Sequence, residues 1–171
     1  MFAAVVGLGN PGPRYVATRH NVGFRVVELL ASRAGAAFRA DGPHLQLARV
    51  AIGGHPVGLA KPMAFMNRSG DPVVALCETT GLGPERVLVV HDDLDLAFGR
   101  LKLKRGGGTA GHRGLASIAE RLGTVEFPRL RIGIGRPPAG VEVADFVLEP
   151  FSGEESEALP GVVELAAEAC C

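Results

Sequence analysis

The sequence predicts a single α/β domain over residues 1–171, built on a twisted, mixed and largely parallel β-sheet with helices on both faces. The length suits one domain, and no linker or internal repeat divides the chain. Short apolar runs alternate with stretches of helical periodicity, and 24 Gly and 12 Pro residues supply the turns. Hydrophobic residues make up 47% of the chain and charged residues 21%, which excludes the disordered and fibrous classes.

The first half of the chain contains four predicted elements. Residues 2–8 form a short apolar run, typical of a buried strand, that ends in a Gly-Asn-Pro-Gly turn. Apolar residues at helical spacing predict a helix over 22–34, which Gly35 ends. Residues 45–52 and 56–60 predict a hairpin across a Gly-Gly turn.

The second half begins with a predicted helix that Asn67 or Ser69 caps and Gly81 closes. A strand of the buried type then runs into the polar sequence from His91 to Asp95. Alternation of strands and helices continues to the end and predicts parallel pairing with helices on both faces. The later elements are strands over 86–90, 99–104 and 130–134 and helices over 114–122 and 152–169.

The net charge is zero, with 18 basic and 18 acidic side chains, but the charges are unevenly distributed. Residues 99–136 carry nine basic and two acidic side chains, whereas residues 137–171 carry eight acidic and no basic ones. Local fields reach about 8 to 10 Å in physiological salt, so a polyanion senses the basic segment and not the total. The neutral total is therefore compatible with a nucleic-acid partner.

Cysteine content and hydropathy bear on the compartment. Cys77, Cys170 and Cys171 are too few and too poorly spaced for a disulfide framework, so we expect reduced thiols in a cytoplasmic protein. No apolar run approaches the roughly 18 residues of a membrane span, and we expect no membrane partner.

The glycines at 7, 9 and 12 spell the dinucleotide-binding pattern Gly-x-Gly-x-x-Gly after the first strand. Pro11 and Pro13 stand where a phosphate-binding helix would offer free N–H groups. The acidic residue about 20 positions further on is Glu28, which lies inside the next predicted helix. The pattern is therefore a weak indication of a nucleotide site, and we expect no cofactor.

Two polar segments follow predicted strands, where ligand sites of open α/β sheets gather. Residues 10–21 include His20, and the second segment includes Asp92. A histidine on one segment and a carboxylate on the other suit a general base and its orienting partner. No Gly-x-Ser-x-Gly motif is present, and Cys77 lies in an apolar helix that disfavours a thiolate. Histidine-activated water is the predicted nucleophile, and an ester is the predicted target.

Two other interpretations of these segments stay open. His20 can be a packing residue, with the aspartates forming a helix cap or a solvated turn. Alternatively, His91, Asp92 and Asp95 can bind the metal of a phosphohydrolase. Adjacent strand residues point to opposite faces, which disfavours one metal bound by both His91 and Asp92, so we expect no metal.

Several segments, taken together and in order, resemble the bacterial peptidyl-tRNA hydrolases. The similarity runs from residue 3 to about residue 151 and is carried by Gly9-Asn10-Pro11-Gly12, Thr18-Arg19-His20-Asn21-Val22-Gly23-Phe24, Phe65-Met66-Asn67, Asp92-Asp93-Leu94-Asp95-Leu96, Gly106-Gly107-Gly108 and Arg129-Leu130-Arg131-Ile132-Gly133. The resemblance implies a monomeric, metal-independent esterase without a cofactor. Its implied activity is to cleave the ester between a peptide and the 3′ end of tRNA, which recycles tRNA from aborted translation.

The resemblance also implies roles for individual residues. Phosphate contacts give affinity without reading sequence, which suits an enzyme that accepts many tRNAs. With one Tyr and no Trp, we expect backbone and ribose contacts in place of base stacking. The implied roles are general base for His20, orienting carboxylate for Asp92, substrate or water positioning for Asn10 and Asn67, cleft shaping for Tyr15 and Met66, and tRNA phosphate binding for Lys104 and Arg131.

One position departs from the family pattern. The family usually reads Gly-Gly-His-Asn-Gly after its glycine run, and here Arg113 stands at the Asn position. We expect Arg113 to bind substrate through a carbonyl or a phosphate, and the alternative is a tRNA-binding or RNA-binding relative whose catalysis Arg113 weakens. We expect His112 to brace the backbone through its ring N–H, and Asp93 and Asp95 to bond loop amides.

Overall fold

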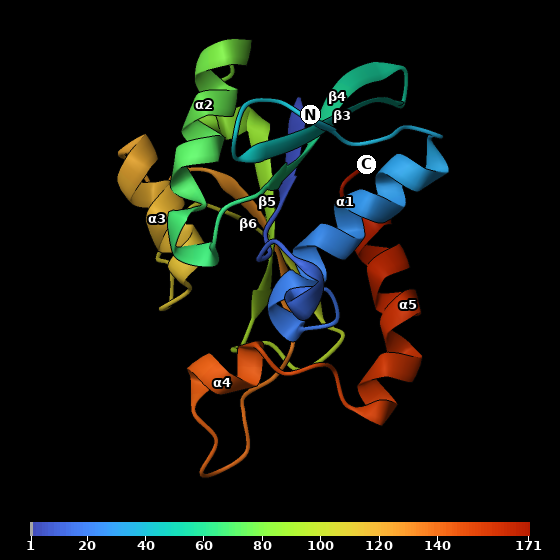
Figure 1. Cartoon of the computed structure of the whole chain (residues 1–171), viewed down its shortest axis with the longest axis vertical. Helices are drawn as coiled ribbons and strands as arrows, with labels where there is room; N and C mark the ends of the chain where they lie inside the picture. Colours follow the sequence, from blue (N-terminus) through green and yellow to red (C-terminus); the bar gives the residue numbers. More distant parts are fainter. Residues whose placement is uncertain (1) are drawn as a thin grey trace.

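The computed structural model describes residues 2–171, which form one α/β domain (Figure 1). Its sheet has seven strands in the order β2-β3-β4-β1-β5-β7-β6. The strands are β1 (Ala4–Gly7), β2 (Arg39–Ala40), β3 (Leu45–Ile52), β4 (His55–Pro62), β5 (Val87–Asp93), β6 (Leu101–Arg105) and β7 (Pro128–Gly133). The central pairs β4-β1, β1-β5 and β5-β7 are parallel, and β3 and β6 run antiparallel to their neighbours. The predicted fold class, a mixed and mostly parallel sheet, is confirmed.

Helices cover both faces of the sheet, as predicted (Figure 1). They are α1 (Val22–Arg33), α2 (Gly70–Thr80), α3 (Arg113–Leu122), α4 (Val143–Val147) and α5 (Gly153–Ala169). Alternate residues of the central strands enter two apolar clusters: Val5 and Leu88 pack with α1 and α5, whereas Val6 and Val89 pack with α2 and α3. Burial on both faces explains why these strands read as continuous apolar runs. No helix within residues 2–171 is both long and apolar enough to cross a membrane.

Two glycines of the Gly-x-Gly-x-x-Gly pattern, Gly7 and Gly9, have a packing role. A Cβ added at Gly7 would lie 2.2 Å from the carbonyl oxygen of Gly23 in α1. A Cβ at Gly9 would lie 2.8 Å from the ring of Phe24. These glycines therefore let α1 approach the end of β1 closely. This approach brings the segment before α1 to the carboxyl ends of the central strands.

Most predicted helix ends agree with the structure, and one predicted cap is wrong. Ser152 and Glu155 form a reciprocal capping box at the start of α5. Neither Asn67 nor Ser69 caps α2 with its side chain; the Ser69 hydroxyl donates to the Met66 carbonyl instead, at 2.8 Å. A hydroxyl can bond to the preceding turn as readily as to a helix terminus, which sequence alone does not distinguish.

Strand β5 is longer than predicted. It extends through Asp93, because pairing with β7 continues in register at His91, Asp92 and Asp93. The polar residues thus lie within the strand and not in a loop after it. Their side chains consequently alternate between the faces of the sheet, as neighbours in a strand must.

Candidate active site

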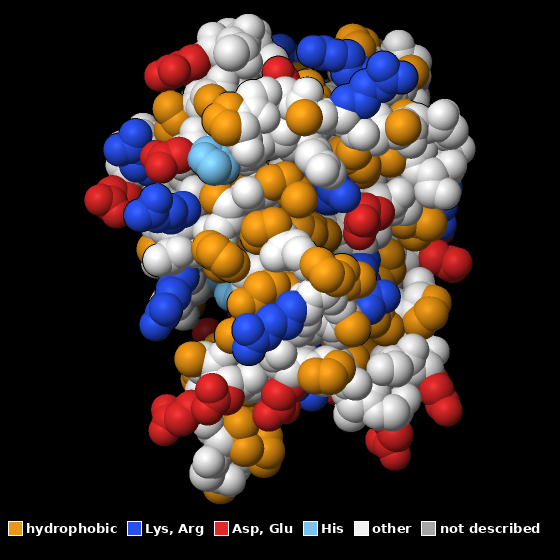
Figure 2. Space-filling view, in the orientation of Figure 1, with side chains coloured by type: hydrophobic (Ala, Val, Ile, Leu, Met, Phe, Trp, Pro, Cys, Tyr) orange, Lys and Arg blue, Asp and Glu red, His pale blue; other side chains and the backbone are white. Residues whose placement is uncertain are grey.

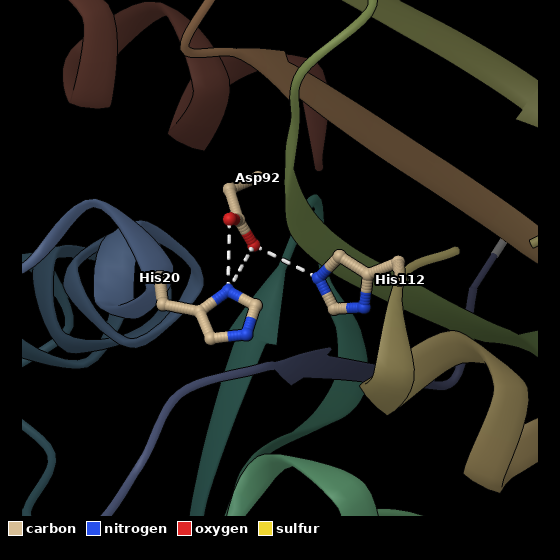
Figure 3. A group of neighbouring side chains, drawn as sticks. All are labelled: His20, Asp92 and His112. Carbon is tan, nitrogen blue, oxygen red and sulfur yellow. Dashed lines mark hydrogen bonds and ion pairs between the residues drawn. The ribbon is translucent and has the colours of Figure 1, made fainter. Parts of the chain in front are cut away.

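The carboxylate of Asp92 lies between two histidine rings near the end of β5 (Figure 3). His20 comes from the short 3₁₀ helix Arg19–Asn21 that leads into α1, and His112 immediately precedes α3. Asp92 is 3% exposed, and the side chains of His20 and His112 are about one-tenth exposed. Three segments that are distant in the sequence thus meet at the carboxyl end of the central strand β5.

His20 is bound to the carboxylate through one ring nitrogen. Its Nδ1 lies 2.8 Å from Oδ2 and 3.0 Å from Oδ1 of Asp92, so this nitrogen carries the proton and donates it. Its Nε2 points away from the carboxylate (Figure 3) and has no hydrogen-bond partner within residues 2–171. This is the arrangement of a general base that an aspartate orients.

His112 braces both the start of α3 and Asp92. Its Nδ1 accepts hydrogen bonds from the N–H groups of Gly114 and Leu115, at 3.1 and 3.2 Å. The proton of this ring must then lie on Nε2, which donates to Oδ1 of Asp92 at 2.8 Å. The expected contact of the His112 ring with the backbone is present, with a correction: the unprotonated nitrogen holds the backbone, and the ring N–H donates to Asp92.

Asp92 is an anion in this setting. Burial raises the pKa of its carboxyl, but attraction to His20 and His112 and their hydrogen bonds outweigh burial and hold the pKa well below its usual range. Asp92 therefore stays ionised at neutral pH and orients its partners without exchanging protons itself.

His91 lies beside this centre and is kept neutral. Its ring packs edge-on against His112, with ring centroids 5.0 Å apart, and its Nδ1 donates to the Asp92 carbonyl at 2.8 Å. Its Nε2 is buried and has no hydrogen-bond partner among residues 2–171. Burial, followed by the proximity of His112, lowers the pKa of His91 to about 3. His91 consequently supports Asp92 as an uncharged group.

Buried, neutral His91 makes stability depend on pH. The unfolded chain binds a proton at His91 near pH 6.5, whereas the folded chain does not until about pH 3. The free energy of unfolding therefore falls with falling pH, with His91 contributing about 2 kcal/mol between about pH 7.5 and 5. Urea unfolding of the wild type and of His91→Gln at both pH values measures this contribution, and an equal pH dependence in the two proteins would contradict it.

The side chains of His20, Asp92 and His112 are also close enough together to share a metal ion. One ligand atom each of His20, Asp92 and His112 lie within 4.8 Å of one another. The His112 nitrogen that faces Asp92 carries a proton, however, because its other nitrogen accepts two backbone N–H groups. A metal ligand must be a deprotonated nitrogen, so this bonding pattern suits a histidine-aspartate pair and not a metal site.

The metal set proposed from sequence does not assemble. Among residues 2–171, His91 and Asp95 do not belong to the candidate metal cluster around Asp92. Asp95 instead pairs with Arg136. Asp93 accepts a hydrogen bond from the Asp95 N–H at 2.8 Å, as expected for a residue that fixes the loop. The prediction that the Asp95 carboxylate also binds a loop amide is wrong, because this carboxylate pairs with Arg136.

Two cavities meet at His20. The larger, of about 410 Å³, extends past Asp92 and His112 toward Asp95 and Glu142. The smaller, of about 240 Å³, contains all four residues expected to position substrate or shape the cleft, namely Asn10, Tyr15, Met66 and Asn67. Both cavities share His20, Arg113 and two residues of α4, Ala144 and Val147. A ligand whose reacting bond lies beside His20 can therefore place one of its two parts in each cavity.

Asn10 is held in one orientation. Its Oδ1 accepts from the Met66 N–H at 2.7 Å, and its backbone exchanges two hydrogen bonds with the side chain of Asn21 at 2.8 and 2.9 Å. The Asn10 amide NH₂ has no partner within residues 2–171 and is available in the smaller cavity. It can donate to a carbonyl oxygen of a ligand.

An aromatic pair in the smaller cavity was missed from the sequence. Phe65 is 56% exposed and packs edge-on against Tyr15, with ring centroids 6.3 Å apart. The expectation of no base stacking rested on the numbers of Tyr and Trp alone, whereas an exposed Phe can also stack on a base. The motif Phe65-Met66-Asn67 was the available signal.

Lys104 and Arg131 lie on neighbouring strands, but only Arg131 forms an ion pair within residues 2–171. They sit on the paired strands β6 and β7. Lys104 is exposed and has no ion pair within residues 2–171, whereas Arg131 is bound to Asp93 at 2.7 Å and is 17% exposed. Arg129, also in the basic segment, is buried and donates to the carbonyls of Gly107 and Gly108. Only part of the basic segment therefore offers free charge.

Acidic side chains gather at the end of the molecule formed by α4 and the start of α5 (Figure 2). Two of them, Glu149 and Glu155, bind Arg19, the residue before His20. Part of the acidic segment is thus structural, and this role was not foreseen from its charge.

This chain is similar to known proteins over nearly its whole length. A family model described as Peptidyl-tRNA hydrolase matches residues 4–171. The peptidyl-tRNA hydrolase of Moorella thermoacetica is 52% identical to this chain, and the match covers 96% of this chain and 87% of that protein. The peptidyl-tRNA hydrolase of Nocardia farcinica is also 52% identical, and the match covers 98% of this chain and 87% of that protein. The crystal structure of peptidyl-tRNA hydrolase from Acinetobacter baumannii matches with a TM-score of 0.89 and 40% identity, covering 98% of this chain and 89% of that one.

Proposed function

Because the chain belongs to the peptidyl-tRNA hydrolase family, we propose that His20 activates the water that cleaves the ester between a peptide and the 3′ end of tRNA. One observation carries this role: His20 is bound to Asp92 through Nδ1, while its Nε2, which has no partner in the described part of the chain (2–171), lies where two cavities meet. The released tRNA returns to translation.

The chemistry needs no nucleophile from the protein. Nε2 of His20 takes a proton from water as the water oxygen attacks the ester carbonyl carbon. The bond between this carbon and the ribose oxygen then breaks, and the imidazolium returns the proton to the ribose oxygen. Asp92 stabilises the imidazolium and keeps the ring in the correct tautomer, as in other histidine-aspartate pairs.

The two cavities supply places for the parts of the substrate. Asn10 and Asn67 line the smaller cavity and position a substrate carbonyl or the attacking water, and Tyr15 and Met66 shape this cavity for the end of the peptidyl adenosine. Arg113 lines both cavities, is exposed and forms no ion pair within residues 2–171. Its guanidinium is suited to bind a substrate carbonyl or phosphate.

Turnover of the wild-type protein on peptidyl-tRNA, with and without EDTA, tests this function. We expect cleavage that persists in the chelator, because the protonated nitrogen of His112 occupies the place of a metal ligand. Activity lost in EDTA and restored by a divalent metal would instead favour metal-dependent hydrolysis. Tight, salt-sensitive tRNA binding with little hydrolysis would favour an RNA-binding relative weakened by Arg113.

Salt dependence distinguishes the two proposed phosphate ligands. Lys104→Ala should weaken tRNA binding and reduce the slope of log K against log salt by about 1, because one free charge is lost. Arg131→Ala should change the slope less, since Asp93 already balances Arg131. Binding of tRNA at several salt concentrations measures both slopes. Arg49→Ala, on β3 far from β6 in the sheet, is the control, and equal slopes for all three variants would contradict the assignment.

We propose that the protein acts as a monomer in the cytoplasm. The substrate arises where ribosomes work, and Cys77, Cys170 and Cys171 are free thiols. Burial raises the pKa of Cys170 to about 12 and also raises the pKa of Cys77, so neither forms a reactive thiolate readily at neutral pH.

A further inference from the structure

The buried guanidinium of Arg19 lies next to the proposed general base and takes no part in the chemistry above. Its side chain is 7% exposed. Nη1 donates to the carbonyl of Phe146 at 3.0 Å and to the carboxylate of Glu149 at 3.2 Å, and Nη2 donates to Glu155 at 2.9 Å. The guanidinium also lies over the Phe146 ring, 3.9 Å from its centroid. One side chain thus joins the segment of His20 to α4 and to the start of α5.

The backbone forms the same connection. The Arg19 N–H donates to the Glu149 carbonyl at 3.1 Å, and Thr18 forms an isolated β-bridge with Pro150. Ala144 and Val147 stand on either side of Phe146 in the sequence and line both cavities with His20. The position of this cavity wall relative to His20 therefore depends on the contacts of Arg19.

Stability alone does not account for this cluster. A buried ion pair is weak evidence for stability, because apolar residues of similar volume often replace it without loss. What a planar, multiply bonded guanidinium supplies is a fixed geometry, which Lys cannot reproduce. We propose that Arg19 is a positioning residue that holds His20 and the α4 wall of the cleft in register for ester cleavage. This inference rests on the proposed role of His20.

Two changes weaken the contacts of Arg19 in different ways. Arg19→Lys keeps the charge and loses the fork of donors. The double variant Glu149→Gln, Glu155→Gln removes the negative charge from both partners of Arg19, and neither residue lines either cavity. A glutamine at 155 keeps an oxygen that accepts from the Ser152 N–H, as Oε1 of Glu155 does, and so preserves the cap of α5. Glu154→Gln is the matched control, because Glu154 is a neighbouring exposed glutamate without an ion pair within residues 2–171.

A second control separates positioning from loss of stability. Val163→Ala removes a buried side chain about two turns further along α5, and it lowers the melting temperature without releasing Arg19. All variants are assayed on peptidyl-tRNA at a temperature where circular dichroism shows them folded. We expect kcat to fall about tenfold in Arg19→Lys and in the double variant, with KM changed less than about twofold, because a misplaced base slows chemistry more than binding. Both controls should keep the wild-type kcat. A wild-type kcat in Arg19→Lys, or an equal loss in Val163→Ala, would overturn the inference.

A readout that does not use turnover distinguishes this inference from the proposed function. The proton that His20 Nδ1 donates to Asp92 gives a hydrogen-bonded imidazole signal in proton NMR. We expect this signal to shift or broaden in Arg19→Lys and to stay in place in Val163→Ala. An unchanged signal in Arg19→Lys would overturn the positioning role even if the wild type cleaves peptidyl-tRNA. A wild type that does not cleave peptidyl-tRNA, with the expected NMR result, would overturn the proposed function and the purpose of the positioning, while still showing that Arg19 holds His20 in place.

Discussion

Replacing His20 with Ala should lower kcat for peptidyl-tRNA cleavage by about 10² to 10⁴-fold, the usual contribution of a positioned general base. The change removes the only group in the structure that both bonds to Asp92 through Nδ1 and presents an unpartnered ring nitrogen where the cavities meet, within residues 2–171. KM changes little, because the expected phosphate contacts lie on β6 and β7 and are untouched. Initial rates over a range of substrate concentrations give both constants.

His55→Ala is the matched control for this prediction. His55 is an exposed histidine in the β3-β4 hairpin and lines neither cavity. We expect its kcat to equal that of the wild type. Unchanged turnover in His20→Ala would remove His20 as the base and favour the interpretation of this histidine as a packing residue.

Asp92→Asn should have the second largest effect, with kcat about 10³-fold lower. In the wild type, two ring N–H groups, from His20 and His112, donate to the one carboxylate of Asp92. An amide offers one oxygen and one NH₂ group, so one of these N–H groups meets a donor. If His20 adopts the other tautomer to avoid this clash, its Nε2 carries a proton and cannot accept one from water. The same substitution in serine protease triads causes a loss of about 10⁴-fold for this reason.

Asp71→Asn serves as the control for loss of an aspartate. Asp71 lies at the start of α2, is more than half exposed and pairs with Arg121 on the surface. Exposed pairs of this kind contribute little to stability, so activity and melting temperature should stay close to wild type. A kcat for Asp92→Asn within about tenfold of the wild type would show that the tautomer of His20 does not depend on Asp92.

The elements of the fold were largely predictable, because periodicity is a local property. The helix over 22–34 and the hairpin over 45–60 follow from spacing and turn residues alone, and the structure agrees within a few residues. The extension of β5 to Asp93 was not predictable, because polar residues were interpreted as the end of a strand. Pairing with β7 decides that point, and β7 lies 35 residues or more away in the sequence.

The candidate site was predictable in its main residues and not in its connections. His20 and Asp92 follow from their positions after strands and from the family motifs. The bond from His112 to Asp92, and the tautomer it imposes, require α3 to begin beside the end of β5. The contact of half-buried Tyr15 with exposed Phe65 likewise joins two segments 50 residues apart.

The sequence by itself determined the fold class, the family resemblance and the residue types available for chemistry, because these depend on local patterns and residue identity. Only the tertiary structure decided which charges are free and which are committed. Arg131 is balanced by Asp93, and Arg19 is bound by two residues of the acidic segment, whereas Lys104 has no such partner within residues 2–171. The physical reason is that a charge's availability depends on the groups within a few ångströms of it, and the order of strands and helices in space sets those groups.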